Sequence, residues 1–189
     1  MYLFFDTETT GLPKNYKTPV SDLNNWPRMV QIAWLMYNKD GNLMAQENHV
    51  IKPVGFTIPV AASTLHGVTT KKAQESGADL ASVLTNFADH IAGSQYLIAH
   101  NIGFDKNIVG AEFLRNRMKN AILGKTLLCT MESGKNHCAI RTSYGLKSPR
   151  LTELHYKLFG RSFDGAHNAL TDITMTAKCF WEMRKKGLI

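Results

Sequence analysis

The chain has 189 residues, of which 44% are hydrophobic and 20% are charged, and it carries a formal net charge of +7 at pH 7. These proportions exclude a disordered or low-complexity chain, and the length fits a single domain over residues 1–189, while the positive charge favours an anionic partner such as nucleic acid. Because no apolar run approaches the ~20 residues of a membrane helix and strand-like sequence begins at Met1, we expect a soluble cytosolic protein with no membrane contact.

The first stretch, residues 2–12, is an apolar and aromatic run that leads into two acidic residues. The run predicts a buried strand, and since side chains alternate along a strand, Asp6 and Glu8 should share one face while Thr7 points away. Two carboxylates at the end of a buried strand repel each other and lose hydration, so they favour a bound cation such as Mg²⁺. The alternative is a plain turn over residues 6–11, because Asp, Thr and Gly are common in turns.

Residues 13–27 are polar and rich in lysine, proline and asparagine, which indicates a loop. Beside an acidic pair, such a loop can be either a substrate wall or an ordinary solvated surface. Two apolar runs follow at residues 29–37 and 43–51, and an Asp-Gly turn separates them. They predict a hairpin, so three antiparallel strands should follow one another at the start of the chain.

The middle of the chain alternates helical and strand patterns. A short helix is predicted over residues 61–67 and a longer one over residues 80–91, followed by a strand at residues 96–99 and a helix that keeps Met118 on its core face. Asp105 falls in the first turn of that last helix, where the helix dipole favours an acid without any function. However, α/β proteins also place ligands at the carboxyl ends of sheet strands.

The last third contains a short strand at residues 127–129 and a helix over residues 151–159. Between them, residues 131–150 are polar and basic, and we interpret them as a solvated loop that could contact phosphates only if a catalytic site lies nearby. His167 and Asp172 open the final helix five positions apart, or about 140° on an ideal helix. Both can face one site only if His167 precedes the first regular turn, which an N-cap at Asn168 or His167 would allow; a surface or capping histidine is the alternative. The helix itself is predicted by apolar residues at core spacing, Leu170, Ile173, Ala177 and Phe180.

Three motifs, in this order, resemble the DEDDh or DnaQ-like family of 3′-5′ exonucleases, typified by the epsilon proofreading subunit of bacterial DNA polymerase III. The matching segments are Asp6-Thr7-Glu8-Thr9-Thr10-Gly11-Leu12, Ala99-His100-Asn101-Ile102-Gly103-Phe104-Asp105 and His167-Asn168-Ala169-Leu170-Thr171-Asp172. The resemblance covers nearly the whole chain and implies one exonuclease domain over residues 1–189. The implied fold is α/β and ribonuclease H-like, with a mixed five-stranded sheet, antiparallel first three strands and helices on both faces.

The resemblance also implies the catalytic residues, which are Asp6, Glu8, Asp105, Asp172 and His167. Two divalent cations, Mg²⁺ or Mn²⁺, would stabilise the attacking and leaving oxygens of phosphodiester hydrolysis. Asp6 would bridge both metals, Glu8 and Asp172 would hold the metal that carries the water, and Asp105 would support the second. His167 would be the general base, because its unperturbed pKa of ~6.5 lets it accept a proton near neutral pH.

Five further residues are expected to contact substrate by the same resemblance: Thr7, Thr9, Leu12, His66 and Phe104. Leu12 would lie beside the terminal base and Phe104 would pack against the nucleotide, while the backbone around Thr7 and Thr9 would donate to the 3′-hydroxyl. For Leu12, Phe104 and His66 the alternative is plain packing or a helix cap.

The expected function is the release of nucleoside monophosphates from DNA 3′ ends, with single-stranded DNA or DNA 3′ ends as the partner. One alternative is an RNA-trimming 3′-5′ exoribonuclease, since the sequence does not show whether the pocket tolerates a 2′-hydroxyl. The other is a catalytically inactive nucleic-acid-binding module of the same fold, although all five catalytic positions carry the required residue types. The sequence indicates no protein partner.

Overall fold

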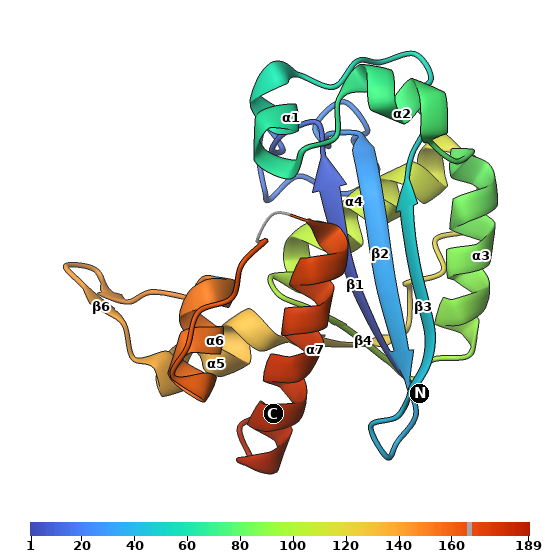
Figure 1. Cartoon of the computed structure of the whole chain (residues 1–189). Coiled ribbons are helices and arrows are strands. Elements are labelled where there is room, and N and C mark those ends of the chain that lie inside the picture. Colours follow the sequence, from blue (N-terminus) through green and yellow to red (C-terminus); the bar gives the residue numbers. More distant parts are fainter. Residues whose placement is uncertain (166–167) are drawn as a thin grey trace.

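The computed structural model describes residues 1–165 and 168–189, in which helices cover both faces of a mixed β-sheet (Figure 1). Within these residues the main sheet has five strands, in the order β3-β2-β1-β4-β5. They are β1 (Tyr2–Thr9), β2 (Met29–Tyr37), β3 (Leu43–Val50), β4 (Tyr96–Ala99) and β5 (Thr126–Cys129). Strands β1 to β3 are antiparallel, whereas β4 runs parallel to β1 and β5 runs parallel to β4. The predicted mixed sheet is therefore confirmed.

The helices of the described residues are α1 (Val60–His66), α2 (Thr70–Ser76), α3 (Leu80–Ala92), α4 (Ile102–Arg115), α5 (Thr130–Cys138), α6 (Leu151–Phe159) and α7 (Ala169–Lys185). In Figure 1, α7 crosses one face of the sheet, and α3 and α4 cover the other. Because side chains alternate along β1, Leu3 and Phe5 pack toward α3 and α4, whereas Tyr2 and Phe4 pack toward α7. Burial on both faces explains the continuous apolar run of this strand. Within the described residues, no helix is long and apolar enough to cross a membrane.

The helix α4 ends earlier than the sequence pattern predicts. It stops at Arg115, and Leu114 is 37% exposed instead of facing the core. The end is closed by a left-handed residue, Arg117 with φ 56°, and by a hydrogen bond of 2.9 Å from the Met118 N–H to the Phe113 carbonyl. This is the geometry of a Schellman motif, which usually carries a glycine. The prediction that Met118 lies on the helix is wrong because that glycine signal is missing.

The interpretation of residues 131–150 as a loop is also wrong. They contain α5 and a small hairpin of β6 (Arg141–Thr142) and β7 (Gly145–Leu146). The buried residues of α5 are Thr130 and Gly134, and Leu154 packs so closely on Gly134 that a Cβ there would lie 2.8 Å from it. A helix that packs through small residues shows no hydrophobic stripe, so its sequence looks like a loop. The unpredicted helix α2 is similar, since its buried residue is Ala73.

Residues 130–165, which comprise α5, the β6–β7 hairpin, α6 and the segment after it, form a lobe on one side of α7 (Figure 1). His100, the residue after β4, ties this lobe to the sheet: its Nδ1 lies 3.0 Å from Thr130 Oγ1 and its Nε2 lies 3.0 Å from the Pro149 carbonyl oxygen. Burial lowers the pKa of His100 to about 4, so the ring is neutral near pH 7. Since a carbonyl only accepts, Nε2–H donates to Pro149 and Nδ1 accepts from the Thr130 hydroxyl.

Candidate catalytic site

The predicted acidic residues come to one edge of the sheet. Strands β1, β4 and β5 are parallel, so their carboxyl ends lie at the same edge, which is where α/β proteins place ligands. Asp6 and Glu8 lie near the end of β1, Asp105 lies in the first turn of α4 after β4, and Asp172 lies in the first turn of α7. The amino end of α7 approaches the end of β1 in Figure 1. Segments that are far apart in the sequence thus supply one group of carboxylates.

Asp6, Glu8 and Asp172 each offer one carboxylate oxygen, and these three oxygens lie within 4.8 Å of one another. Asp6 and Glu8 share a face of β1, as the alternation of side chains predicts. A set of oxygen ligands that are all anionic and partly buried fits a hard divalent cation such as Mg²⁺ or Mn²⁺. The donor set therefore fits the predicted metals.

Asp105 is hydrogen-bonded to β1 through Thr7, on the face of the strand opposite Asp6 and Glu8. It is 3% exposed, and its Oδ1 accepts hydrogen bonds from the Thr7 backbone amide at 3.0 Å and from the Thr7 hydroxyl at 2.7 Å. Thr7 points away from Asp6 and Glu8, as predicted, and that orientation lets it connect β1 with α4. The connection fixes the position of Asp105 relative to the carboxylate group.

Burial and mutual repulsion disfavour the ionised forms in this group of acids and raise the pKa values of Asp6, Glu8 and Asp105. Burial, followed by the charges of Asp105, Asp172 and Glu8, raises the pKa of Asp6 well above its usual range. Burial, followed by Asp172 and Asp105, raises the pKa of Glu8 to about 7. Burial also raises the pKa of Asp105 to about 7, although the two hydrogen bonds from Thr7 act in the opposite direction. A bound cation favours the ionised forms and would reverse these shifts.

We expect divalent metal to stabilise the chain more at pH 7.5 than at pH 5. Without metal, folded Glu8 and Asp105 hold protons up to about pH 7, whereas their ordinary pKa values are 4.5 and 3.8. Between these limits the folded state binds more protons than the unfolded state, so its free energy of unfolding falls as pH rises. Metal removes this loss because it binds the ionised carboxylates, and it must displace those protons at pH 5.

The measurement is the gain in Tm on replacing EDTA by Mn²⁺, taken at several pH values. The gain in Tm is used instead of Tm itself because His100 also makes stability depend on pH. Its pKa is lowered to about 4, so its contribution to stability rises with pH. That contribution is the same with and without metal and cancels in the gain. A gain of ~1 kcal/mol in a domain of this size raises Tm by about 2–4 °C. A gain that is constant or that shrinks from pH 5 to pH 7.5 would contradict the assignment of these carboxylates as the metal site.

A pocket of about 390 Å³ adjoins Glu8. Its lining includes all the residues that the sequence resemblance places against substrate, namely Thr7, Thr9, Leu12, His66 and Phe104. Leu12 is 74% exposed, so most of its side chain is accessible to a molecule in the pocket. The structure thus brings these side chains together, and their contact with substrate stays a prediction.

His66, the last residue of α1, lines the same pocket as the end of β1. Its ring is 6% exposed, and Nδ1 accepts a hydrogen bond of 3.2 Å from the Val68 backbone amide. Burial lowers the pKa of His66, and a backbone carbonyl of Thr9 partly offsets that effect. The His66 side chain is therefore a neutral, buried part of the pocket lining, not an exposed capping residue.

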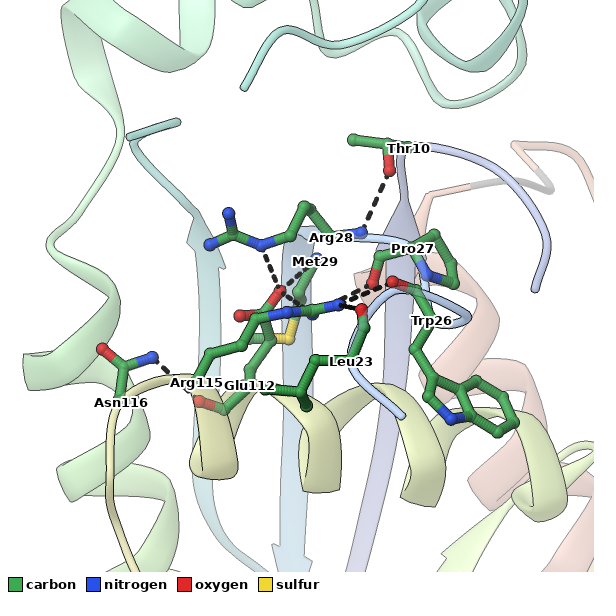
Figure 2. A network of polar contacts seen from close by, with 9 residues as sticks. All are labelled: Thr10, Leu23, Trp26, Pro27, Arg28, Met29, Glu112, Arg115 and Asn116. Carbon is green, nitrogen blue, oxygen red and sulfur yellow. Dashed lines mark hydrogen bonds and ion pairs between the residues drawn. The ribbon is translucent and has the colours of Figure 1, made fainter. Parts of the chain in front are cut away.

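The loop over residues 13–27 is held by a buried network that the sequence patterns miss (Figure 2). At its centre is Glu112 of α4, which is 0% exposed. Its Oε1 accepts three hydrogen bonds, from Arg28 Nε at 2.9 Å, the Met29 amide at 3.0 Å and Arg115 Nη1 at 2.9 Å. Arg115 also donates to three carbonyl oxygens of the loop, those of Leu23 and Trp26 at 2.6 Å and of Pro27 at 3.3 Å.

This network connects the loop to the pocket. The Arg28 amide donates to Thr10 Oγ1 at 3.0 Å, and Thr10 lines the pocket beside Glu8. Breaking a buried ion pair of this kind typically costs about 3–5 kcal/mol, so the loop is firmly held. These contacts hold the loop in place, but residues 13–27 are not among the residues that line the pocket, so a role as a substrate wall stays a prediction.

The predicted general base, His167, lies outside the described residues, as does Ala166. The next residue, Asn168, is the N-cap of α7, and its Oδ1 accepts hydrogen bonds from the amides of Leu170 at 3.2 Å and Thr171 at 3.3 Å. The expected cap at this position is therefore confirmed. It fixes the start of the helix whose first turn contains Asp172.

A family model described as exonuclease, RNase T, matches residues 3–180. Among solved structures, Escherichia coli Exonuclease I in complex with a dT13 oligonucleotide superposes with a TM-score of 0.78 and 21% sequence identity, over 99% of this chain and 42% of that chain. Product-bound exonuclease I gives 0.77 and 20%, over 99% and 44%. The zinc-bound E. coli Exonuclease I complex with single-stranded DNA gives 0.77 and 20%, over 99% and 41%.

These structures share the ribonuclease H-like fold with the present chain, including the antiparallel first three strands of its mixed sheet. The chain spans less than half the length of each of them. Among curated proteins, none matches the chain in sequence.

Proposed function

This chain belongs to the DnaQ-like family of 3′-5′ exonucleases, and we propose that it forms one exonuclease domain that releases nucleoside monophosphates from DNA 3′ ends with two divalent cations, Mg²⁺ or Mn²⁺. The observation that carries the proposal is the group of three carboxylate oxygens within 4.8 Å, from Asp6, Glu8 and Asp172, beside a pocket of about 390 Å³. That volume lies within the range of roughly 300–1,000 Å³ that is typical of small-ligand sites.

The acidic residues and His167 have different roles in the proposed hydrolysis. Asp6, Glu8 and Asp172 would hold the cations, and Asp105, positioned by two hydrogen bonds from Thr7, would support the second cation. When bound, two metals stabilise the attacking and leaving oxygens of an in-line displacement. His167 accepts the proton of the attacking water.

The pocket residues hold the terminal nucleotide at this centre. Phe104 and Leu12 offer apolar surfaces for the base and sugar, and the end of β1 supplies backbone groups for the 3′-hydroxyl. A nucleotide held in this pocket has its terminal phosphodiester beside the carboxylates, because Glu8 belongs both to the pocket lining and to the carboxylate group.

Single-stranded DNA is the substrate that we propose first. Exonuclease I, which shares this fold, is solved with dT13 and dA16 oligonucleotides. An RNA-trimming activity is the second candidate, because the family model that matches this chain takes its name from ribonuclease T. The two differ in whether the pocket accepts a 2′-hydroxyl.

One experiment tests both candidates. A single strand labelled at its 3′ end or at its 5′ end is incubated with Mg²⁺, with Mn²⁺ or with EDTA, as DNA and as RNA of the same sequence. We expect immediate loss of the 3′ label and a descending ladder from the 5′ label, only with metal and faster on DNA. Faster cleavage of RNA would favour the second candidate. No cleavage of either strand at any metal concentration would leave a nucleic-acid-binding module and reject the proposal.

A further inference from the structure

The tip of the β6–β7 hairpin presents an aromatic side chain that the proposed reaction does not use. Tyr144 is 99% exposed, and the hairpin projects from the lobe away from the sheet (Figure 1). The turn is stabilised: Thr142 Oγ1 donates to the Gly145 carbonyl at 2.9 Å and accepts from the Tyr144 amide at 3.2 Å, and Gly145 has a φ of 104° that favours glycine. A hydrogen-bonded turn that carries an exposed tyrosine offers an aromatic ring on which a ligand can stack.

A hollow of about 390 Å³ lies at the base of the same hairpin. Cys138 lines it from the end of α5, Ile140 lines it from the residue before β6, and Tyr156 and Lys157 line it from α6. Tyr156 is 60% exposed, so a second aromatic ring lies open beside a cationic side chain. The lobe thus combines two exposed tyrosines with a depression between its elements.

The lobe is positively charged. Its 36 residues carry a net charge of +3, from three acidic residues and six basic ones, Lys135, Arg141, Lys147, Arg150, Lys157 and Arg161. Glu153 is neutralised by Lys147 at 2.8 Å and by Arg150 at 3.2 Å. Arg141 pairs with Leu146 through its backbone, and its side chain has no hydrogen-bond or ion-pair partner among the described residues, so its charge is available three positions before Tyr144.

The lobe is attached to the catalytic edge at two points. His100, which bonds Thr130 and Pro149 of the lobe, is followed directly by the turn that leads to Asp105. The far end of the lobe leads to α7 and Asp172. The lobe begins directly after β5, whose carboxyl end lies at the same edge of the sheet as those of β4 and β1, and in Figure 1 it lies beside α7. A strand with its 3′ end at the carboxylates can therefore continue over the lobe.

We propose that the lobe is a second binding site for a single nucleic-acid strand, in which a base stacks on Tyr144 and backbone phosphates contact Arg141 and Lys157. The inference rests on the proposed function, since the bound strand is the one whose 3′ end occupies the pocket beside Glu8. Aromatic stacking combined with unpaired cations is how proteins hold single strands without reading their sequence. The site adds affinity only for strands long enough to extend from the pocket to the hairpin.

The test compares two matched double variants in EDTA, where the strand is not cleaved. Tyr144→Ala/Arg141→Ala removes one exposed ring and one cation from the hairpin. Met44→Ala/Lys39→Ala removes one exposed apolar side chain from the start of β3 and one cation from the β2–β3 connection, at the end of the sheet opposite the site. Kd is measured for 5′-labelled dT20 and dT4 by fluorescence anisotropy, and Tm is measured to confirm that both variants fold.

We expect the hairpin variant to weaken dT20 binding roughly 10- to 100-fold and dT4 binding far less, because stacking and one phosphate contact are lost. The slope of log Kd against log salt for dT20 should fall by about 0.7, as expected for one phosphate contact on a single strand. An equal loss in both variants, an equal loss for both lengths, or no loss would overturn the proposal. Binding does not require cleavage, so a wild-type chain that cleaves nothing would reject the proposed function while this comparison still decided the role of the lobe.

Discussion

Asp6→Asn is expected to lower the rate of nucleotide release by more than ~10³-fold, because one missing charge-stabilising group at a reacting centre already costs about 10²–10³. Asp6 is central in the carboxylate group: its pKa is raised by burial and by the charges of Asp105, Asp172 and Glu8. An amide of the same shape keeps the packing of β1 but supplies a neutral oxygen, which is a weak ligand for a divalent ion. Asp6→Asn should therefore lose the metal-dependent rate of nucleotide release while the chain stays folded.

The same substitution should raise the Tm of the metal-free chain. In the folded state, burial and the neighbouring acids disfavour the ionised form of Asp6, so at neutral pH folding must either keep an unfavourable charge or take up a proton, and asparagine removes this cost. Active sites often keep such unfavourable groups, so variants that lose activity can gain stability. A gain of ~1 kcal/mol corresponds to about 2–4 °C for a domain of this length.

The measurement combines an exonuclease assay with thermal unfolding in EDTA and in Mn²⁺. The matched control is Asp40→Asn, since Asp40 is an exposed aspartate in the β2–β3 turn at the opposite end of the sheet. Asp6→Asn should lose activity, gain Tm in EDTA and lose most of the gain in Tm from Mn²⁺, whereas Asp40→Asn should behave as the wild type. An Asp6→Asn chain that is less stable in EDTA, or that keeps its activity, would show that Asp6 has a structural role instead.

The sequence predicts this centre well because its geometry is local. Alternation along a strand places Asp6 and Glu8 on one face and Thr7 on the other, and a strand buried on both faces is apolar throughout. The helix that starts at Ala169 is predicted by its apolar spacing and by the capping residue Asn168. Each of these features depends on residues that are neighbours in the sequence.

The features that the sequence does not predict depend on distant contacts. Glu112 and Arg115 form an ordinary charged pair on a helix, three positions apart, and only the fold shows that the carboxylate is fully buried under the loop. His100 is part of a motif, but its hydrogen bonds join it to residues 30 and 49 positions away. The helix α5 packs through Thr130 and Gly134, so it lacks the periodicity from which a helix is predicted.

His167→Ala is expected to lower the rate roughly 10²–10⁴-fold at neutral pH, because a positioned general base contributes about that much. An unperturbed histidine has a pKa of ~6.5, so a histidine base predicts that the wild-type rate rises with pH through that region and then levels. The carboxylates remain in the variant, so the gain in Tm from Mn²⁺ should be retained, which separates loss of the base from loss of metal. This separation is the reason to compare His167→Ala with Asp6→Asn in the same two assays.

The matched control is His90→Ala, because His90 lies near the end of α3 just before β4 begins, at the edge of the sheet opposite the carboxylates. His90→Ala should keep the wild-type rate and pH profile. In His167→Ala, the rise with pH near 6.5 should disappear and give way to a rate that increases with hydroxide at higher pH, because solvent must then accept the proton of the attacking water. Full turnover of His167→Ala at neutral pH would instead mean that another group accepts that proton, and Glu8, whose pKa burial and the neighbouring acids raise to about 7, would be the next residue to test.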